Sequence, residues 1–284
     1  MLKALSRFVS SWVGTIVLVL LAIFFVAQTF IIPTRSMVGT LYEGDMLFVK
    51  KFVYGIPIPR LPWIDLPLLP DFRGNGHLIE GKRPNRGEVV VFIPLTNKGY
   101  FVKRLFAVGG DEVIFNATGF YLRPFEAQSD PGYIAKHFPK HKIKRFMGKD
   151  FVFAPYESNH KGIFYAHHNQ TFEVMRAIYH HQFPIKDLKV SMQEVDMGDE
   201  VVFYTKVDPD HFFMIGDNRD DSSDSRFWGS VSYSHIVGTP WFTYFSLNLT
   251  NSEGVRNSRD IFKVRWKRMF KSLQGLETLA AEGK

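Results

Sequence analysis

Cysteine is absent from this chain of 284 residues. Its absence excludes structural disulfides, thiolate metal ligands and a cysteine nucleophile, although it leaves the cellular compartment open. The chain has ten histidines, but none lies in an H-E-x-x-H metal motif or in the setting of a G-x-S-x-G serine motif. We therefore expect scattered, mostly exposed histidines, and we predict neither a metal site nor an organic cofactor.

Charged residues are absent from one long stretch, between Phe8 and Thr34. Its core, Trp12 to Ile32, is 21 residues long. As a helix it would span about 31 Å, close to the thickness of the hydrocarbon layer of a bilayer. A cleavable signal peptide would have a shorter apolar region, about 7–15 residues, and an A-x-A-like site after it. Residues 8–34 are therefore predicted to form one N-terminal transmembrane helix.

The charges beside this stretch predict its orientation. Lys3 and Arg7 precede it, which favours a cytoplasmic N-terminus over residues 1–7 and places the large remainder on the far side. In a bacterium this is a single-pass protein of the inner (plasma) membrane with a periplasmic or extracellular domain. The net charge of +7 indicates either a basic surface without a specific partner or contact with an anionic lipid bilayer. Nucleic acid is not an expected partner, because the bulk of the chain lies across the membrane.

The rest of the chain has the patterns of a mainly β protein. Short runs of β-branched and aromatic residues between Gly-rich turns predict an antiparallel β-rich core over residues 35–118 and 200–255. Residues 119–199 have weak periodicity and many His, Lys and Tyr residues, and we expect a smaller inserted domain there. Residues 256–284 form a basic, amphipathic tail, for which a membrane-surface helix and a solvated helix are both open.

A proline-rich segment interrupts the first part of the predicted core. Five prolines between residues 57 and 70 exclude a regular helix or a central strand. The same segment is strongly apolar, with a Trp, an Ile and several Leu residues. It is interpreted either as a buried irregular loop or as an apolar flap that lies on the bilayer interface.

Two short segments carry side chains suited to nucleophilic catalysis. In "TRSMVGTL", Ser36 lies two residues after the end of the uncharged stretch, and Gly39 permits a tight turn after it. In "YFVKRLFAV", Lys103 would share a strand face with Phe101 and Leu105. A lysine acts as a base only when it is neutral, and this requires desolvation. Lys103 is therefore either a buried base or a lysine on the wet face of an edge strand.

A third segment, "GDNRDDSSDSRFWG", covers residues 216–229. Its aspartates suggest calcium, but the run departs from the EF-hand pattern after Arg219. A network of turn hydrogen bonds with Asp–Arg pairs fits the composition better. In such a network, Ser222 could hold the amine of a lysine in place.

Together these segments resemble those of the bacterial type I signal peptidases (leader peptidases). That family has a serine in an S-M dipeptide just after its anchor, a lysine in a K-R pair before a G-D turn, and a "GDNRDxSxDSRxWG" box. The order, spacing and membrane placement agree over the anchor and over roughly residues 30–115 and 200–250. One departure is Gly39, which stands where the family usually has proline, so the rigidity of that turn is open.

The resemblance implies a role for each matching residue. Ser36 would be the nucleophile and Lys103 the general base. The further implied roles are oxyanion binding by Thr34, orientation of the lysine by Ser222, support of the site by Asp224, Arg226 and Arg104, and substrate pockets lined by Ile32, Met37, Leu41 and Val102. The implied fold is a β-rich catalytic core with a smaller inserted domain.

The resemblance also implies an activity and its partners. The chain would be an endopeptidase that removes N-terminal signal peptides from secretory preproteins, after small residues at the −1 and −3 positions, without a cofactor. Two alternatives remain open, a specialised relative that matures one dedicated substrate and a non-catalytic anchored binding domain. The oligomeric state is not predicted.

Overall fold

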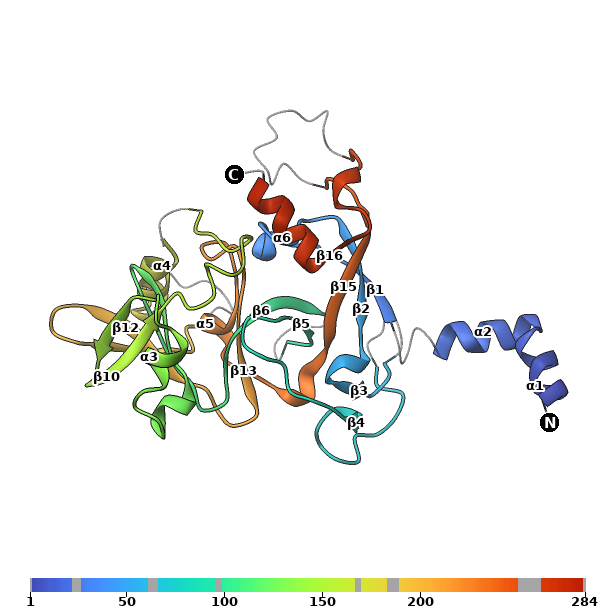
Figure 1. The fold of residues 1–284 in the computed structure, drawn as a ribbon, viewed down its shortest axis with the longest axis horizontal. Coiled ribbons are helices and arrows are strands. Elements are labelled where there is room, and N and C mark those ends of the chain that lie inside the picture. The colour runs from blue at the N-terminus through green and yellow to red at the C-terminus, as the bar shows by residue number, and fades with distance from the viewer. Residues whose placement is uncertain are drawn as a thin grey trace.

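The fold is mainly antiparallel β, as the sequence predicts (Figure 1). The computed structural model describes residues 2–21, 27–60, 66–94, 99–166, 170–182, 189–249 and 262–282. The strands follow the expected alternation. In β2 (Asp45–Lys50), for example, Leu47 and Val49 are buried between half-buried neighbours, which is the pattern of a strand with one face on a core.

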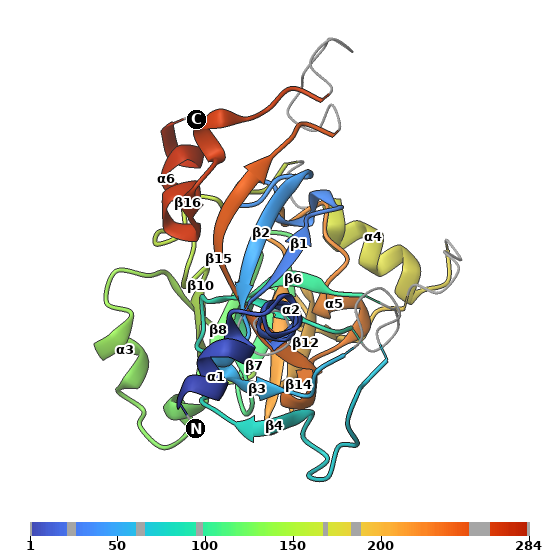
Figure 2. The same cartoon turned by 90° about the vertical axis from the view of Figure 1, so that its right-hand side faces the viewer.

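The larger sheet joins strands from both ends of the chain. Within the described ranges it has eight strands, in the order β1-β2-β15-β5-β6-β13-β14, with β16 paired to β15. Figure 2 shows β1, β2 and β15 side by side. The remaining bounds are β1 Ala27–Ile31, β5 Val89–Phe92, β6 Phe101–Val108, β13 His211–Ile215, β14 Val231–Ser232, β15 Ile236–Ser246 and β16 Lys271–Ser272.

The smaller sheet corrects the predicted limits of the insertion. Its six strands have the order β11-β12-β7-β8-β10-β9 within the described residues. They are β7 Glu112–Asn116, β8 Gly119–Arg123, β9 Ile143–Phe146, β10 Lys149–Phe153, β11 Gln193–Asp196 and β12 Val201–Lys206. The sheet extends beyond the predicted 119–199 on both sides, because β7 and β12 pair with each other, Phe115 opposite Phe203.

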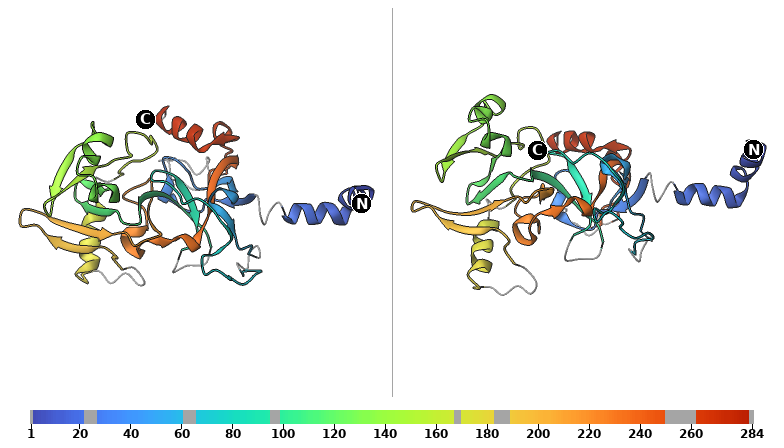
Figure 3. Two further views of the ribbon diagram at one scale, coloured as in Figure 1. Left: turned by 60° about the horizontal axis from the view of Figure 1, so that its bottom comes forward. Right: turned by 90° about the horizontal axis from the view of Figure 1, so that it is seen from below.

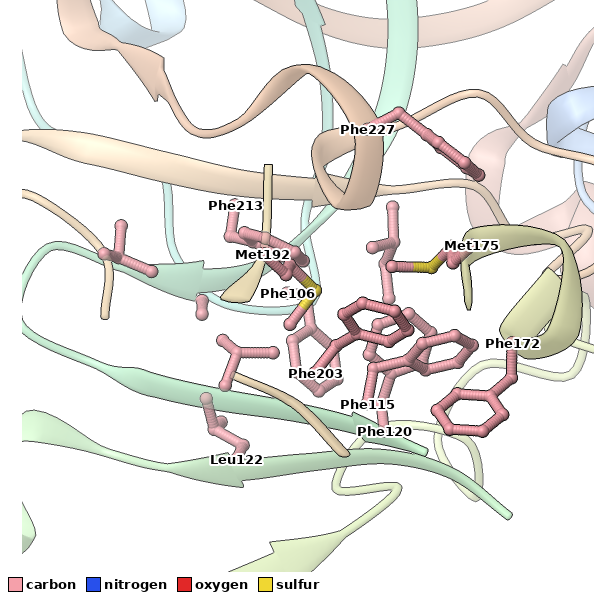
Figure 4. Close-up of a cluster of buried hydrophobic side chains, with 14 of the residues drawn as sticks. Phe106, Phe115, Phe120, Leu122, Phe172, Met175, Met192, Phe203, Phe213 and Phe227 are labelled. Carbon is pink, nitrogen blue, oxygen red and sulfur yellow. The ribbon is translucent and has the colours of Figure 1, made fainter. Parts of the chain in front are cut away.

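A large apolar cluster lies where the two sheets meet (Figure 4). The chain leaves the larger sheet after β6 and returns to it at β13, whose Phe212 pairs with Val108 of β6. The cluster contains side chains from both sheets and from two helices, α4 (Gln170–Tyr179) and α5 (Ser225–Trp228). Its largest members are Phe106, Phe115, Phe120, Phe172, Phe203, Phe213 and Phe227. This packing fixes the smaller sheet against β6, the strand that contains Lys103.

The N-terminal region differs from the predicted single helix over residues 8–34. It contains α1 (Leu2–Val9), α2 (Trp12–Leu21) and then β1, and the two helices extend away from the sheets (Figures 1 and 3). No helix among the described residues has both the length and the apolar character needed to cross a membrane. The last predicted turns are strand instead, because β1 hydrogen-bonds along its whole length to β2.

The C-terminal segment is packed onto the larger sheet, where the sequence left a solvated or membrane-surface helix open. After the 3₁₀ turn Trp266–Arg268, β16 pairs with β15, and α6 (Leu273–Glu282) follows beside them (Figure 2). Leu276 of α6 is only 1% exposed. The predicted boundary between core and tail, at residues 255 and 256, lies outside the described residues.

The other elements are short. They are a two-stranded ribbon of β3 (Gly55–Pro57) and β4 (His77–Glu80), the helix α3 (Tyr133–His137), and the 3₁₀ turns Arg35–Met37, Phe52–Tyr54, Phe125–Gln128 and Tyr233–His235. In the proline-rich segment, residues 61–65 lie outside the described ranges. The part that follows presents Leu66, Leu68, Leu69 and Phe72 to the surface, so these apolar side chains are not buried in the body of the molecule.

Candidate active site

Ser36 lies in the 3₁₀ turn Arg35–Met37, between β1 and β2, and its side chain is largely buried. Thr34 is extended and the next three residues turn, with the Val38 N–H bonded to the Arg35 carbonyl at 2.9 Å. The turn then needs Gly39, whose φ is +104°. A Cβ at this position would lie 2.0 Å from the Gly162 carbonyl oxygen. Glycine therefore supplies here a backbone conformation that proline could not adopt.

Lys103 is buried in the middle of β6 and is only 4% exposed. Its Nζ donates a hydrogen bond to Ser36 Oγ, and it lies 5.6 Å from the centre of the Phe101 ring. Burial lowers the pKa of Lys103 from its ordinary 10.5 to about 8, while Asp224 and Asp217 oppose this shift. The amine is thus adjacent to a hydroxyl and loses its proton more readily than a solvated lysine does.

Thr34 contributes a second hydroxyl to the same place. Its Oγ1 lies 3.3 Å from Ser36 Oγ, and either oxygen can be the donor. Thr34 is exposed at the edge of the site whereas Ser36 is buried. A donor that stands beside a nucleophilic oxygen from the solvent side can stabilise negative charge as it develops on a bound carbonyl.

Residues 216–229, the polar box, hold the turn Arg35–Met37, the serine turn, in place. They do so through two residues to which the sequence analysis gave no role. The Asn218 N–H donates to the Ser36 carbonyl at 3.1 Å, and Asn218 Nδ2 donates to the Arg35 carbonyl at 3.2 Å. Asp217 accepts a 2.5 Å hydrogen bond from the Thr40 hydroxyl. Asp217 and Asn218 both belong to the recognised box, which was the available indication that they are functional. Their hydrogen-bond partners could not be predicted, because these lie 177 or more positions away in the sequence.

Asp224 and Arg226 form a buried ion pair within the box. Arg226 Nε and Nη2 each lie 2.8 Å from one oxygen of Asp224, and Asp224 also accepts from the Gly216 N–H at 3.1 Å. Burial alone would raise the pKa of the Asp224 carboxyl, but Arg226 holds it below its usual range. The pair braces the loop from residue 216 to residue 226, and Arg226 Nη2 also donates to the Arg219 carbonyl at 2.7 Å.

Ser222 does not make the predicted contact with the lysine. Its hydroxyl is buried and contributes, after Arg226 and the Gly216 N–H, to the low pKa of the Asp224 carboxyl. It lies against the backbone of Gly216, where an added Cβ would be 2.3 Å from Ser222 Oγ. The expected bond to Lys103 is thus absent, because the Lys103 amine is directed to Ser36.

Arg104 follows Lys103 in β6 but contacts different residues. Its guanidinium forms two hydrogen bonds of 2.7 Å with Asp217 and a third, of 2.6 Å, with Glu277 of α6. Burial alone would raise the pKa of Asp217, but Arg104 holds it low. His160 adds to this network, with its Nδ1 3.1 Å from Glu277 Oε1. The expectation of scattered, exposed histidines therefore fails for His160.

An open cleft of about 410 Å³ leads to Ser36 and Lys103. Its apolar wall includes three of the four predicted pocket residues, Ile32, Met37 and Val102. Leu41 does not line the cleft. It is fully buried in the apolar cluster beneath it, to which Ile32 and Met37 also belong. The complete lining is Phe30, Ile31, Ile32, Pro33, Thr34, Arg35, Ser36, Met37, Glu43, Tyr100, Phe101, Val102, Lys103, Asp221 and Ser223.

The site has the parts of acyl-transfer chemistry. A hydroxyl, a neighbouring amine of lowered pKa and a second hydroxyl meet at the end of an apolar cleft. No group of three potential metal ligands occurs in the described part of the chain. A nucleophile with an adjacent base is the arrangement that hydrolyses amides through a covalent acyl-enzyme.

The chain is similar to known proteins over most of its length. The family model of signal peptidase, peptidase S26, matches residues 5–245. A signal peptidase I of Helicobacter pylori is 61% identical over 98% of this chain and 96% of its own length. A signal peptidase I of Rickettsia typhi is 27% identical over 97% of this chain and 96% of its own length.

A solved signal peptidase I of Enterococcus faecalis aligns with 56% of this chain and 97% of its own, at 20% identity and a TM-score of 0.26. The assignment therefore depends on the sequence matches. These extend over most of the chain and include the segments that contain Ser36, Lys103 and the polar box. The chain belongs to the signal peptidase family S26.

Proposed function

We propose that this chain is a signal peptidase I that hydrolyses the bond between a secretory signal peptide and the mature protein. Ser36 is the nucleophile and Lys103 the general base. The observation that carries the proposal is the hydrogen bond from the buried Lys103 amine to the Ser36 hydroxyl at the end of an apolar cleft. Only a desolvated amine loses its proton near neutral pH and can then take the proton of a serine.

The reaction proceeds in two halves. Neutral Lys103 takes the proton of Ser36 Oγ as this oxygen attacks the scissile carbonyl carbon, and the C–O bond forms. The tetrahedral intermediate collapses, the C–N bond breaks, and the Lys103 ammonium gives its proton to the leaving amine. A water molecule then loses a proton to Lys103 and attacks the acyl-enzyme carbon, which forms a second tetrahedral intermediate. The bond between this carbon and Ser36 Oγ breaks, the Lys103 ammonium returns the proton to Ser36, and the signal peptide leaves with a free carboxylate.

The intermediate requires donors for its oxyanion. We assign this role to the Ser36 backbone N–H and the Thr34 hydroxyl, which lies 3.3 Å from Ser36 Oγ. Asp217, Asn218, Asp224 and Arg226 support the site from behind, through the bonds that fix the serine turn and the loop after β13. Such donors, fixed in advance, contribute most where water is excluded.

The cleft suits an extended peptide with small side chains. β1 is the first strand of the larger sheet and pairs on one side with β2. Its other edge can add a peptide strand, whose alternate side chains then point the same way. We propose that the wall with Ile32, Met37 and Val102 receives small residues at −1 and −3, and that the partners are secretory preproteins.

The location follows from the same assignment. We propose that the uncharged residues ahead of β1 attach the enzyme to the bacterial inner membrane, with Lys3 and Arg7 on the cytoplasmic side. The catalytic domain then faces the periplasm or the exterior. There, Ser36 meets cleavage sites that emerge just outside the bilayer.

The test is cleavage of a purified preprotein in detergent by the full chain. We expect Ser36→Ala and Lys103→Ala to lose more than 99% of the activity, since a dyad fails when either member is removed. The exposed Ser129→Ala and Lys140→Ala variants serve as controls. Activity retained by Ser36→Ala or Lys103→Ala would refute the mechanism. A panel of preproteins separates a general enzyme, which cleaves many of them, from a relative dedicated to one.

A further inference from the structure

The C-terminal segment, residues 262–282, lies beyond the part of the chain that matches the family model, which ends at residue 245. It nevertheless reaches the back of the candidate active site. Leu276 of α6 is buried in one apolar cluster with Met37, the residue after the nucleophile, and with Ile32 and Leu41. The helix thus contributes part of the floor beneath the turn that contains Ser36.

A charged contact joins α6 to β6. Glu277 Oε1 accepts a 2.6 Å hydrogen bond from Arg104 Nη2, and the two side chains are only 12% and 2% exposed. Arg104 also pairs with Asp217, and Asp217 accepts from Thr40. Glu277 is therefore the second carboxylate of a buried guanidinium whose backbone neighbour is Lys103.

Arg268 of the C-terminal segment contacts the chain just after the turn that contains Ser36. Arg268 Nη2 donates to the Thr40 carbonyl at 2.8 Å and to Asp45 Oδ2 at 2.6 Å, and its Nε donates to Asp45 Oδ1 at 3.1 Å. Thr40 is thus bound at its carbonyl by Arg268 and at its hydroxyl by Asp217. The C-terminal segment contacts the chain on both sides of the site, at residues 37–45 and at residue 104.

We infer that residues 262–282 are a positioning element for the Ser36–Lys103 pair, and that Glu277 is its main positioning residue. The inference rests on the proposed function. Glu277 holds the guanidinium of Arg104 in place, and this restricts sideways movement of β6, the strand that contains Lys103. Leu276 packs in the apolar cluster beneath the serine turn. Displacement of a nucleophile from its base by as little as 1 Å costs about 100-fold in rate.

The test compares two matched charge removals on α6. Glu277→Gln keeps the shape of the side chain and removes its charge, and the exposed Glu282→Gln is the control. Preprotein cleavage by the full chain in detergent gives kcat and KM, and thermal unfolding gives the fraction of folded enzyme. We expect kcat per folded molecule to fall about 10- to 100-fold in Glu277→Gln, with KM within twofold and Glu282→Gln unchanged.

Each outcome decides the inference. Wild-type kcat per folded molecule in Glu277→Gln would overturn it even if the unfolding temperature falls, because Glu277 would then only hold the helix in place. If Glu277→Gln does not fold, Leu276→Val replaces it, and an unchanged kcat per folded molecule there also overturns the inference. A Ser36→Ala arm separates the two proposals. Retained activity in that arm refutes the proposed function, whereas its loss beside a fully active Glu277→Gln refutes the positioning role alone.

Discussion

Replacing Lys103 with methionine is expected to stabilise the protein at neutral pH. Methionine keeps an unbranched side chain of similar length and removes the buried amine. The pKa of Lys103 is about 8 in the folded chain, against 10.5 for the ordinary amine. Between these values the unfolded state binds more protons, so the free energy of unfolding rises with pH across this window. The cost of burying the amine is complete below about pH 8 and disappears above about pH 10.5.

The magnitude follows from the two pKa values. Their difference of about 2.5 corresponds to about 3 kcal/mol of unfolding free energy. We therefore expect Lys103→Met to exceed the native chain in stability by up to about 3 kcal/mol at pH 7, and this difference to shrink steadily toward pH 10. Lys51 also has a pKa lowered by burial to about 8, but it is present in both proteins and cancels.

The assay is unfolding by urea in detergent at pH 7, 8, 9 and 10, with the exposed Lys140→Met as the control variant. The control should follow the native chain at every pH. Parallel stability curves of the native chain and Lys103→Met would refute the reasoning, because they would mean that the amine keeps its ordinary pKa after folding.

Three substitutions around the serine have sharper effects on rate than on folding. Thr34→Val removes the hydroxyl beside Ser36 and should lower kcat by about 10²- to 10³-fold, whereas Thr34→Ser should keep most activity; an unchanged kcat in the Val variant would exclude Thr34 from the oxyanion site. Gly216→Ala places a Cβ 2.4 Å from the Ser36 carbonyl oxygen and should lower kcat/KM about 100-fold. Normal steady-state cleavage by this variant would show that the loop at residue 216 moves without displacing Ser36. Val102→Phe fills the cleft wall and should lower kcat/KM by about 10- to 200-fold for a substrate with Ala at −1 and −3, while equal cleavage of such a peptide by both enzymes would exclude that pocket.

The fold could be predicted as far as local patterns reach. Short runs of β-branched and aromatic residues predicted the strands of the core, and the polar box predicted a loop with turn hydrogen bonds, but the four strands within residues 119–199 were not predicted. Which strands pair with each other depends on contacts between distant parts of the chain. The local sequences of β7 and β12 therefore did not show that both belong to the smaller sheet. The end of the uncharged stretch was ambiguous for a related reason. An apolar run that includes Ala27–Ile31 fits a buried helix or a strand, and only its pairing with β2 decides.

The site divides in the same way. Ser36, Lys103 and the polar box lie in short motifs from which their chemical roles could be predicted. The structure brings the serine and the lysine into contact. The second carboxylate on Arg104 is Glu277, 173 positions away, and no local pattern connects them. Leu41 was misassigned for a physical reason. An apolar residue near a nucleophile can line a pocket or lie in the core beneath it, and only the folded chain shows that Ile32 and Met37 reach the cleft while Leu41 of the same cluster does not.

The most direct test of the central claim, that a buried neutral lysine activates Ser36, is the pH dependence of kcat/KM for preprotein cleavage. At pH 7, a pKa of about 8 leaves about one Lys103 in ten neutral, against about one in three thousand at 10.5. We predict a rate that rises tenfold per pH unit below pH 8, levels off near pH 8 and is absent in Lys103→Ala. A rate that continues to rise to pH 10, or the same profile in Lys103→Ala, would contradict the account.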